Sequence, residues 1–229
     1  AYITGDPKLI QIVETGKNVH DVNVPLLFSD QGVLGSSHPL WKPARRAAKA
    51  YQFGRRQYGG GKQEVHRNMI ADAPELEFTM KQFDRVEAMY NEMYPVAAEW
   101  DRYIREYARK RRRVESPFGR VRLLNGNDRD IEKQALNMGS QSAAATVMNK
   151  AQLRVEKRLI EAGLMEPELV LPVTKTETIL QIHDQLITET PIKDVPRVVP
   201  IMIEEMTRPV QFTNWRGQGC TIHPKVDPE

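Results

Sequence analysis

Apolar residues recur every three or four positions through the first half of the chain, which is the spacing of amphipathic helices. Asp6 followed by Pro7 is typical of a helix cap with a first-turn proline. Three glycines at 59–61 end a basic helix that opens near Pro43. The helices predicted for this half cover residues 6–28 (a pair joined by a Gly-Lys-Asn turn), 43–57, 75–92 and 95–113.

The pattern changes after Val114. Residues 114–124 are typical of a turn between short strands. Residues 170–190 alternate and are rich in β-branched side chains, which predicts two strands with His183 and Asp184 at the bend. Further helices are predicted over 130–162 and 194–207, and a final strand over 208–215. Helices first and strands later indicate an α+β fold with two subdomains.

The composition is that of a packed globular protein. Hydrophobic residues make up 40% of the 229 residues and charged residues 28%, which argues against wholesale disorder. No apolar run approaches the roughly 18 residues that a membrane span needs, and Ala1 opens no signal-peptide pattern. The single cysteine, Cys220, excludes an internal disulfide and a cysteine-based zinc cage. We therefore expect a soluble, cytoplasmic protein.

Charge is distributed unevenly, although the net charge is only +3. Two basic blocks and one acidic block would let the chain bind a polyanion with the first two and a cation with the third. The plainer interpretation, solvated helix faces, stays open for each block. The first basic block (Lys42, Arg45, Arg46, Lys49, Arg55, Arg56 and Lys62) contains no acid, the second runs from Arg102 to Arg122, and the acidic block runs from Glu161 to Asp194.

The basic helix carries one stripe with a specific chemistry. Arg45, Lys49 and Phe53 are four residues apart and share one face. Two cations one turn apart, followed by an aromatic ring, suit a triphosphate followed by a sugar or base. An amphipathic helix with a solvated cationic face is the alternative.

The predicted hairpin carries a carboxylate at its bend. Asp184 lies between apolar strands, where it can be aimed at a divalent metal, and Mg²⁺ sites use one or two carboxylates plus substrate phosphates. An aspartate that only caps the turn is the alternative.

The helix and the hairpin match two signatures of one family. RRAAKAYQFG at 45–54, followed by Tyr58-Gly59, resembles the fingers-helix signature Arg-x3-Lys-x3-Phe/Tyr-Gly with its later Tyr-Gly in family A DNA polymerases, the DNA polymerase I type. LQIHDQL at 180–186 is similar to their palm signature, which ends in His-Asp-Glu. Three further stretches resemble the family in the same order: 5–28, VESPFGRVRLL at 114–124 and EKQALNMGSQSAAATVM at 132–148.

This resemblance implies the fingers (residues 1–115) and the C-terminal palm (residues 116–229) of a DNA-dependent DNA polymerase. The implied reaction is magnesium-dependent, template-directed nucleotidyl transfer, with two ions in the complete site. The implied partners are primer-template DNA and deoxynucleoside triphosphates. A bacterial or viral replication context follows, and the unusual motif variants favour a phage or another virus.

The resemblance also implies roles for single residues. Arg45, Lys49 and His20 would hold the triphosphate, Phe53 would lie against the sugar and base, and Tyr58 would guard the templating position. It implies DNA contacts for Arg120, Asn137, Gln141 and His183, and catalytic roles for Lys49 and for Asp184, which would also hold the metal ions. A plain surface role for His20 and hydrogen bonds within the palm for Asn137 and Gln141 stay open.

The chain departs from the family's pattern at several positions. Tyr58 comes one residue later after Lys49 than in the family, so either the helix carries a local bulge or Gln57 takes the tyrosine's place. Three other residues replace the customary ones: Gln185 for Glu, Ser142 for Gly and Lys133 for Arg.

The family's first catalytic carboxylate belongs to a palm strand about ten residues before the position that matches Ala1. Two-metal phosphoryl transfer needs ligands for ions about 3.5–4 Å apart. We therefore expect this chain to be inactive alone and to need an upstream segment or partner chain that carries the other aspartate. Without that strand, the hairpin would keep an apolar edge that recruits a partner.

Two other functions stay open. A single-subunit RNA polymerase shares the same motif logic, and the residue that would bar a ribose 2′-hydroxyl belongs to the absent segment. A non-catalytic nucleic-acid-binding or assembly subunit would need only the basic blocks, with salt-sensitive affinity. Asp184 discriminates, because a binding module should not depend on it.

Overall fold

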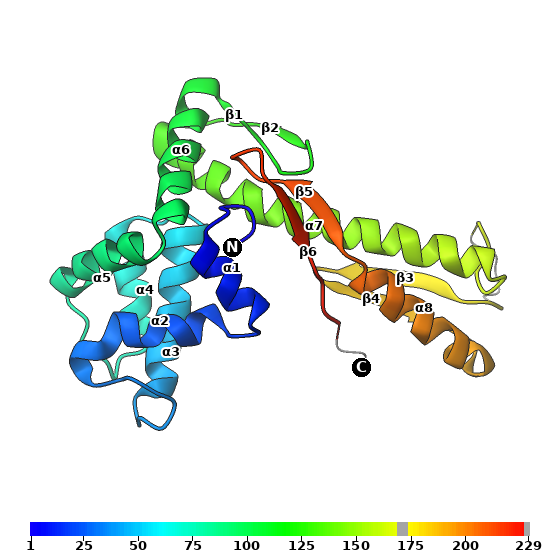
Figure 1. Cartoon of the computed structure of the whole chain (residues 1–229), viewed down its shortest axis with the longest axis horizontal. Coiled ribbons are helices and arrows are strands. Elements are labelled where there is room, and N and C mark those ends of the chain that lie inside the picture. The colour runs from blue at the N-terminus through cyan, green and yellow to red at the C-terminus, as the bar shows by residue number, and fades with distance from the viewer. Residues whose placement is uncertain (169–173, 227–229) are drawn as a thin grey trace. The chain divides into compact units, whose positions relative to one another are not determined.

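A computed structural model of the chain describes residues 1–168 and 174–226. The chain divides into two compact units, and each is described by itself below. The first unit comprises Ala1–Ser140 with Thr213–Gln218, and the second comprises Gln141–Phe212 with Gly219–Glu229. The boundary therefore falls inside one long helix, α7, rather than in a linker (Figure 1).

The first unit is mainly helical. Its elements are α1 (Pro7–Glu14), α2 (Val19–Phe28), a 3₁₀ turn (Ser29–Gln31), α3 (Trp41–Tyr51), a π-helix (Gln52–Gln57), α4 (Lys62–Asp72), α5 (Met80–Met93), α6 (Pro95–Arg111), β1 (Arg113–Glu115), β2 (Val121–Leu123) and the first part of α7 (Asp128–Glu161). The second unit holds the rest of α7, β3 (Glu177–Ile182), β4 (Gln185–Glu189), a 3₁₀ turn (Ile192–Asp194), α8 (Val195–Thr207), β5 (Val210–Thr213, which reaches the unit boundary) and β6 (Gly219–Ile222).

The strands form small antiparallel sheets of two strands each: β1 with β2, β3 with β4, and β5 with β6. The predicted α+β class is therefore confirmed. The predicted helix pair, the basic helix, the long helix and the hairpin with its bend at 183–184 are all present. The predicted strand over 170–173 lies outside the described residues.

Two elements were not predicted from the sequence. α4 has a weak apolar stripe, with only Val65 and Met69 buried, so its periodicity gave no helical signal. β6 is a four-residue strand around Cys220 that becomes a strand only by pairing with β5.

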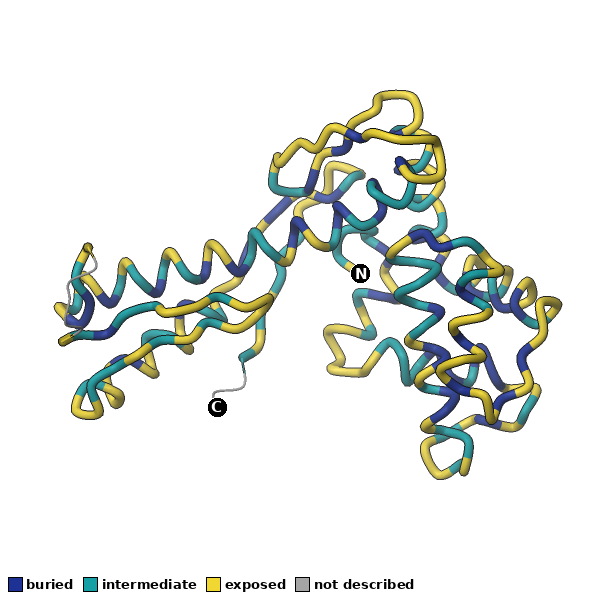
Figure 2. The backbone as a smooth tube through the Cα atoms, turned by 180° about the vertical axis from the view of Figure 1, so that it is seen from behind, coloured by how far each residue is buried: buried dark blue, intermediate teal, exposed yellow. Residues whose placement is uncertain are grey.

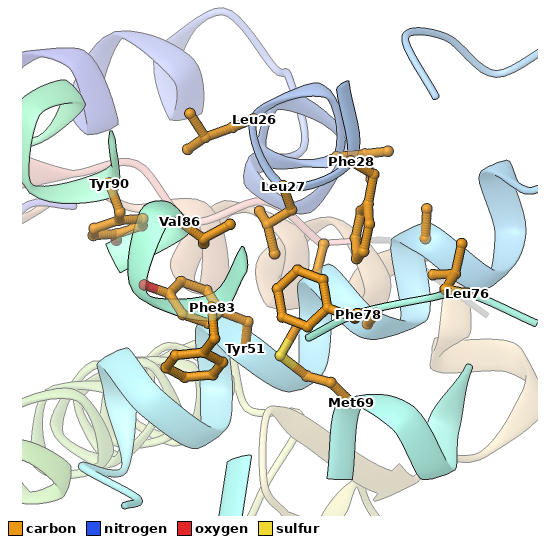
Figure 3. Close-up of a cluster of buried hydrophobic side chains, with 14 of the residues drawn as sticks. Leu26, Leu27, Phe28, Tyr51, Met69, Leu76, Phe78, Phe83, Val86 and Tyr90 are labelled. Carbon is orange, nitrogen blue, oxygen red and sulfur yellow. The ribbon is translucent and has the colours of Figure 1, made fainter. Parts of the chain in front are cut away.

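The core of the first unit is aromatic and lies among α2, α3, α4 and α5 (Figure 3). The ring of Tyr51 meets the ring of Phe83 edge-on, with centroids 5.6 Å apart, and Phe28 packs on Phe78 at 5.4 Å. Tyr51, Phe28 and Phe83 are all fully buried. This core fixes the inner face of α3, and the opposite face carries the predicted site residues.

Asp6 joins two helix starts that are far apart in the sequence. Its Oδ1 accepts hydrogen bonds from the backbone N–H groups of Lys8 and Leu9, which caps α1. Its Oδ2 accepts from the N–H groups of Val96 and Ala97, which caps α6. The predicted cap is therefore confirmed, and this one buried carboxylate satisfies four orphan donors at the positive ends of two helices.

In the second unit, α7 and α8 pack through Val155, Leu159 and Val198. Glu205 of α8 is fully buried and forms ion pairs with the guanidinium groups of Arg154, Arg158 and Arg208. The β3–β4 hairpin has no buried residue in either strand (Figure 2). Large apolar side chains of the hairpin are exposed: Ile179 by 58%, Leu180 by 47%, Ile182 by 42% and Ile187 by 42%.

Candidate functional site

The extra residue between Lys49 and Tyr58 is absorbed by a π-helix. Residues Gln52–Gln57 form a π-helix, in which a backbone hydrogen bond spans five positions instead of the four of an α-helix. The N–H of Tyr58 accordingly donates to the carbonyl oxygen of Phe53 at 2.9 Å. The two rings stack with centroids 6.2 Å apart and planes 22° from parallel. Of the two possibilities raised by the spacing, the structure has the bulge. The Gln57 side chain instead donates to Ser140 Oγ at 3.1 Å.

Glycines make the bulge possible. The N–H of Gly60 donates to the carbonyl oxygen of Gly54 at 2.7 Å, which closes the widened turn. A Cβ at Gly60 would lie 2.8 Å from that oxygen and 2.9 Å from the Val65 side chain, so no larger residue fits. Gly59 has a φ of +65°, which glycine adopts without strain. π-helices of this kind occur often at functional sites.

His20, Lys49 and Phe53 lie together on one surface of the first unit. The His20 ring lies 5.3 Å from the Phe53 ring, and the Lys49 ammonium lies 5.7 Å from the same ring's centroid. The Tyr58 ring stacks on the same Phe53 ring. Phe53 is therefore in contact with a cation, an imidazole and a phenol. The proximity predicted for these nucleotide-binding candidates is therefore present in the structure.

The His20 imidazole is half-buried, and its Nδ1 is buried without a hydrogen-bond partner among the described residues. Burial lowers the pKa of His20 from its ordinary 6.5, and the nearby charges of Arg45 and Lys49 lower that pKa further, against the raising effect of Asp21. The imidazole is therefore neutral at pH 7. An anion placed beside it would reverse these charge effects and favour its protonated form.

Arg45 is already paired. Its Nε donates to the Asp21 carboxylate of α2, and the two side chains are 41% and 42% exposed. This pair could not be predicted from sequence spacing, because Asp21 precedes Arg45 by 24 positions. An ion pair this exposed contributes little stability, so an anionic ligand can compete for the guanidinium.

Most of the first basic block is neutralised by acids from other helices. Arg46 pairs with Glu75, Arg55 with Glu87, and Lys62 with Asp84 and Glu87, while the Arg56 guanidinium lies over the Tyr90 ring at 4.0 Å. Among residues 1–168 and 174–226, Lys42 and Lys49 are the members of this block with no recorded ion pair or ring-stacked guanidinium. Of the seven predicted cations, Lys49 is thus the one that has no ion pair among the described residues and also lies beside the Phe53 ring.

The candidate DNA contacts are distributed over both units. Arg120 follows the β1–β2 turn, is exposed, and has no ion pair within the described ranges. Asn137, on α7 in the first unit, is half-buried, and its Oδ1 is buried without a recorded partner in the part of the chain that is described. Gln141 begins the second unit and is exposed. The structure leaves their role in DNA binding a prediction.

His183 and Asp184 form the two-residue turn between β3 and β4 in the second unit. His183 has a φ of +52°, a left-handed conformation that hairpin turns usually give to glycine or asparagine. Both side chains are exposed. A non-glycine residue held in this region is a strained position of the kind that clusters at functional sites.

The Asp184 carboxylate has no hydrogen bond or ion pair in the described part of the chain, so its oxygens are available to a hard cation. The described residues contain no group of three or more His, Cys, Asp or Glu side chains able to hold a metal ion. One carboxylate of suitable chemistry is therefore present, and it does not by itself fit two ions.

Comparisons with known proteins give a consistent result. The sequence model of DNA polymerase family A matches residues 1–214. The chain is 31% identical over 215 residues to the thermostable DNA polymerase I of Thermus thermophilus and 27% identical over 214 residues to the DNA polymerase I of Rhizobium leguminosarum. Each match covers 90% of this chain but only 23% and 19% of the relative, respectively, so the chain spans about a quarter of their length or less.

A solved structure agrees in fold. The polymerase domain of Pol1 from M. smegmatis, determined in complex with DNA primer-template and dNTP, superposes with a TM-score of 0.69. The match is 23% identical and covers 90% of this chain and 34% of that one. None of the helices in the described ranges combines the length and apolarity that crossing a membrane requires.

Proposed function

The chain belongs to DNA polymerase family A, and on that premise we propose that it supplies the nucleotide-binding surface and one catalytic carboxylate of a template-directed DNA polymerase. The observation that carries the proposal is the grouping of His20, Lys49 and Phe53, with an uncompensated ammonium and a neutral imidazole beside one half-buried aromatic ring. This grouping suits a deoxynucleoside triphosphate: cations for phosphate, and an aromatic face for sugar and base.

The chemistry proposed for this surface is electrostatic. Phosphoryl transfer leaves little covalent work for the protein, so catalysis depends on positioning and on charge stabilisation. Lys49 would offset the negative charge on the transferred phosphate, and Arg45 would join it by exchanging Asp21 for the ligand. His20 would gain a proton or a hydrogen bond as the triphosphate enters, because its Nδ1 has no partner to give up in the described structure.

Magnesium ions, when bound, would neutralise phosphate charge and activate the primer hydroxyl. Asp184 would provide one oxygen ligand from the strained turn of the β3–β4 hairpin, and His183 would lie next to it toward the primer end. A second carboxylate is needed for two ions, and we propose that it comes from another polypeptide segment. In this proposal the fingers correspond to residues 1–115 and the palm to 116–229.

The DNA partner would be a primer-template duplex. Arg120, Asn137 and Gln141 would contact its backbone and minor groove, where a degenerate pattern of acceptors lets pair shape be checked without reading sequence. A replication role in the cytoplasm of a bacterium, or of a cell infected by a virus, completes the proposal.

Primed-template extension with Mg²⁺ and deoxynucleotides tests it. The protein is assayed with the segment that carries the second carboxylate, as wild type, Asp184→Asn and Glu189→Gln. Glu189 is the matched control, because it is an exposed carboxylate on the same hairpin. We expect extension by the wild type and by Glu189→Gln, and none by Asp184→Asn, with duplex binding kept in all three.

Extension that persists in Asp184→Asn would contradict the proposal. Unchanged salt-sensitive duplex binding, with no extension by any of the three proteins, would instead favour a binding or assembly subunit. Replacing deoxynucleotides by ribonucleotides in the same assay separates a DNA polymerase from an RNA polymerase.

A further inference from the structure

A cleft of about 340 Å³ lies in the first unit, among α6, the β1–β2 turn, the start of α7 and residues 213–215. None of the predicted nucleotide-binding residues lines it. Four of its lining residues are aromatic: Trp100, Tyr103, Tyr107 and Trp215. Among the described residues, Glu115 is the only charged one in the lining. Aromatic walls with a single carboxylate have the chemistry of a site for an organic cation.

The aromatic residues form a row, and one end of this row already holds a guanidinium. The rings of Tyr107 and Tyr103 lie 5.9 Å apart with planes at 30°, and those of Tyr103 and Trp215 lie 5.0 Å apart with planes at 31°. The Arg216 guanidinium lies 5.0 Å from the Trp215 ring, within the roughly 6 Å of a cation–π contact. Tyr103, in the middle of the row, is 42% exposed and is therefore open to a second planar cation.

The Glu115 carboxylate is available to such a cation. Glu115 is the last residue of β1, is exposed, and has no ion pair within residues 1–168 and 174–226. Arg113 and Arg120 flank the wall segment 114–119 but do not line the cleft. A guanidinium can form two parallel hydrogen bonds to a carboxylate and lie flat on an aromatic ring, whereas an ammonium lacks this planar shape.

The N–H donors of one wall are already used within the protein. Trp215 Nε1 donates to the carbonyl oxygen of Thr4 at 2.9 Å, and Asn214 Nδ2 donates to Gln218 Oε1 at 3.0 Å. These bonds hold the wall in place, so a ligand would lose little free energy to ordering the site. They also occupy an indole and an amide donor that would otherwise suit an anion, which again favours a cationic occupant.

We propose that this cleft binds an arginine side chain presented by a peptide segment of a partner protein. The guanidinium pairs with the Glu115 carboxylate and lies against the Tyr103 ring. The choice of occupant rests on charge and shape, because the one charge in the lining is negative and the row already accepts the planar cation of Arg216. The inference goes beyond the proposed polymerase function and does not rest on it.

The test follows the indole N–H signals of the ¹⁵N-labelled chain by NMR during titration with a five-residue alanine peptide that has arginine at its centre. The chain has three tryptophans, and Trp41, which packs on the helical core and does not line the cleft, is the internal control. We expect the signals of Trp100 and Trp215 to shift and that of Trp41 to stay. Matched peptides with citrulline, which has arginine's shape without its charge, or with lysine should bind at least about tenfold more weakly.

Two substitutions test the groups that would hold the arginine. Glu115→Gln should weaken binding of the arginine peptide by about tenfold, because it removes the charge and keeps the shape. Glu106→Gln is the matched control, since Glu106 is an exposed carboxylate of α6 outside the lining, and it should bind like the wild type. Tyr103→Leu should weaken binding by about fivefold. The dispersion of the NMR signals confirms that each variant folds.

Equal binding of the arginine and citrulline peptides would overturn the proposal, and so would undiminished binding in Glu115→Gln. Equal shifts at all three indoles would show that the peptide does not bind at this cleft. None of these measurements needs primer extension. Arginine binding that depends on Glu115 and Tyr103 therefore stands if the polymerase proposal fails, and its absence leaves that proposal unaffected.

Discussion

The N–H of Tyr58 donates to the carbonyl oxygen of Phe53, and the rings of these two residues stack on each other. Tyr58 follows Phe53 by five positions, so the bond is one that a π-helix forms and an α-helix, with its four-position spacing, does not. The insertion that lengthens the fingers signature is therefore taken up in the backbone. The ring pair stays intact on the surface where His20 and Lys49 also lie.

The stacked pair should contribute measurable coupling. In a double-mutant cycle with Phe53→Leu and Tyr58→Leu, we expect about 1 kcal/mol of interaction in the free energy of unfolding, because aromatic pairs add about 0.5–1.5 kcal/mol beyond burial. Urea unfolding of the four proteins measures it. A coupling within error of zero would show that the two rings are only neighbours.

Lys49→Ala should lower turnover far more than duplex affinity. Loss of one preorganised electrostatic donor reduces kcat by about 10²–10³-fold. Lys42→Ala is the matched control, since Lys42 is a second exposed lysine of α3 without an ion pair among the residues described. Single-turnover extension and duplex binding are measured in parallel. Equal losses in both for Lys49→Ala would make it a plain DNA-backbone contact.

His20 should make stability depend on pH. Because burial and the charges of Arg45 and Lys49 lower the pKa of His20 in the folded state, the unfolded chain binds more protons as pH falls below 6.5. The contribution is present above pH 6.5 and is lost as pH falls toward the lowered pKa. The free energy of unfolding should therefore fall more between pH 7.5 and 5.5 in the wild type than in His20→Gln. Equal slopes for the two proteins would disprove the shift.

Asp6→Ala should destabilise the first unit by about 2–3 kcal/mol, because one N-cap contributes about 0.5–2 kcal/mol and this carboxylate caps two helices. Asn18→Ala is the comparison, since Asn18 caps α2 alone and should cost about 1 kcal/mol. Chemical denaturation followed by circular dichroism gives both values. Similar costs for the two variants would mean that the bonds to Val96 and Ala97 add nothing.

Glu205→Gln should destabilise the second unit by about 3–5 kcal/mol, because it removes the charge that compensates three arginines at a fully buried position. Glu204→Gln tests the neighbouring carboxylate, which is exposed and whose one ion pair among the described residues is with Arg158. It should cost about 0–1 kcal/mol. The two values come from thermal and urea unfolding, and a small loss in Glu205→Gln would show that water reaches the cluster.

Local signals explain which features were predictable. Three features were predictable because each depends on only a few neighbouring residues, and all three are in the structure. They are the cap formed by Asp6 and Pro7, the three glycines at 59–61 and the bend at 183–184. The partners of the basic block were not predictable, because Glu75 and Glu87 reach Arg46 and Arg55 only after the helices pack. A charge count along the chain therefore overstated the free positive charge of that block.

The contact between the rings of Tyr103 and Trp215 could not be predicted from the sequence for the same reason. Tyr103 and Tyr107 lie one turn apart on α6 and look like an ordinary helix face, whereas Trp215 joins them from a segment more than 100 positions later. Only the fold shows that the three rings line one cleft.

The double cap of Asp6 has a consequence for the order of folding. The carboxylate and Val96 are 90 positions apart, so the bond to α6 closes a long loop at an entropic cost, and we expect it to form late in folding. The contact should be absent from the transition state, and a mutation that removes it should speed unfolding while leaving the folding rate nearly unchanged. We therefore expect the Asp6 side chain to slow the unfolding of the first unit and so to lengthen the time that this unit stays folded.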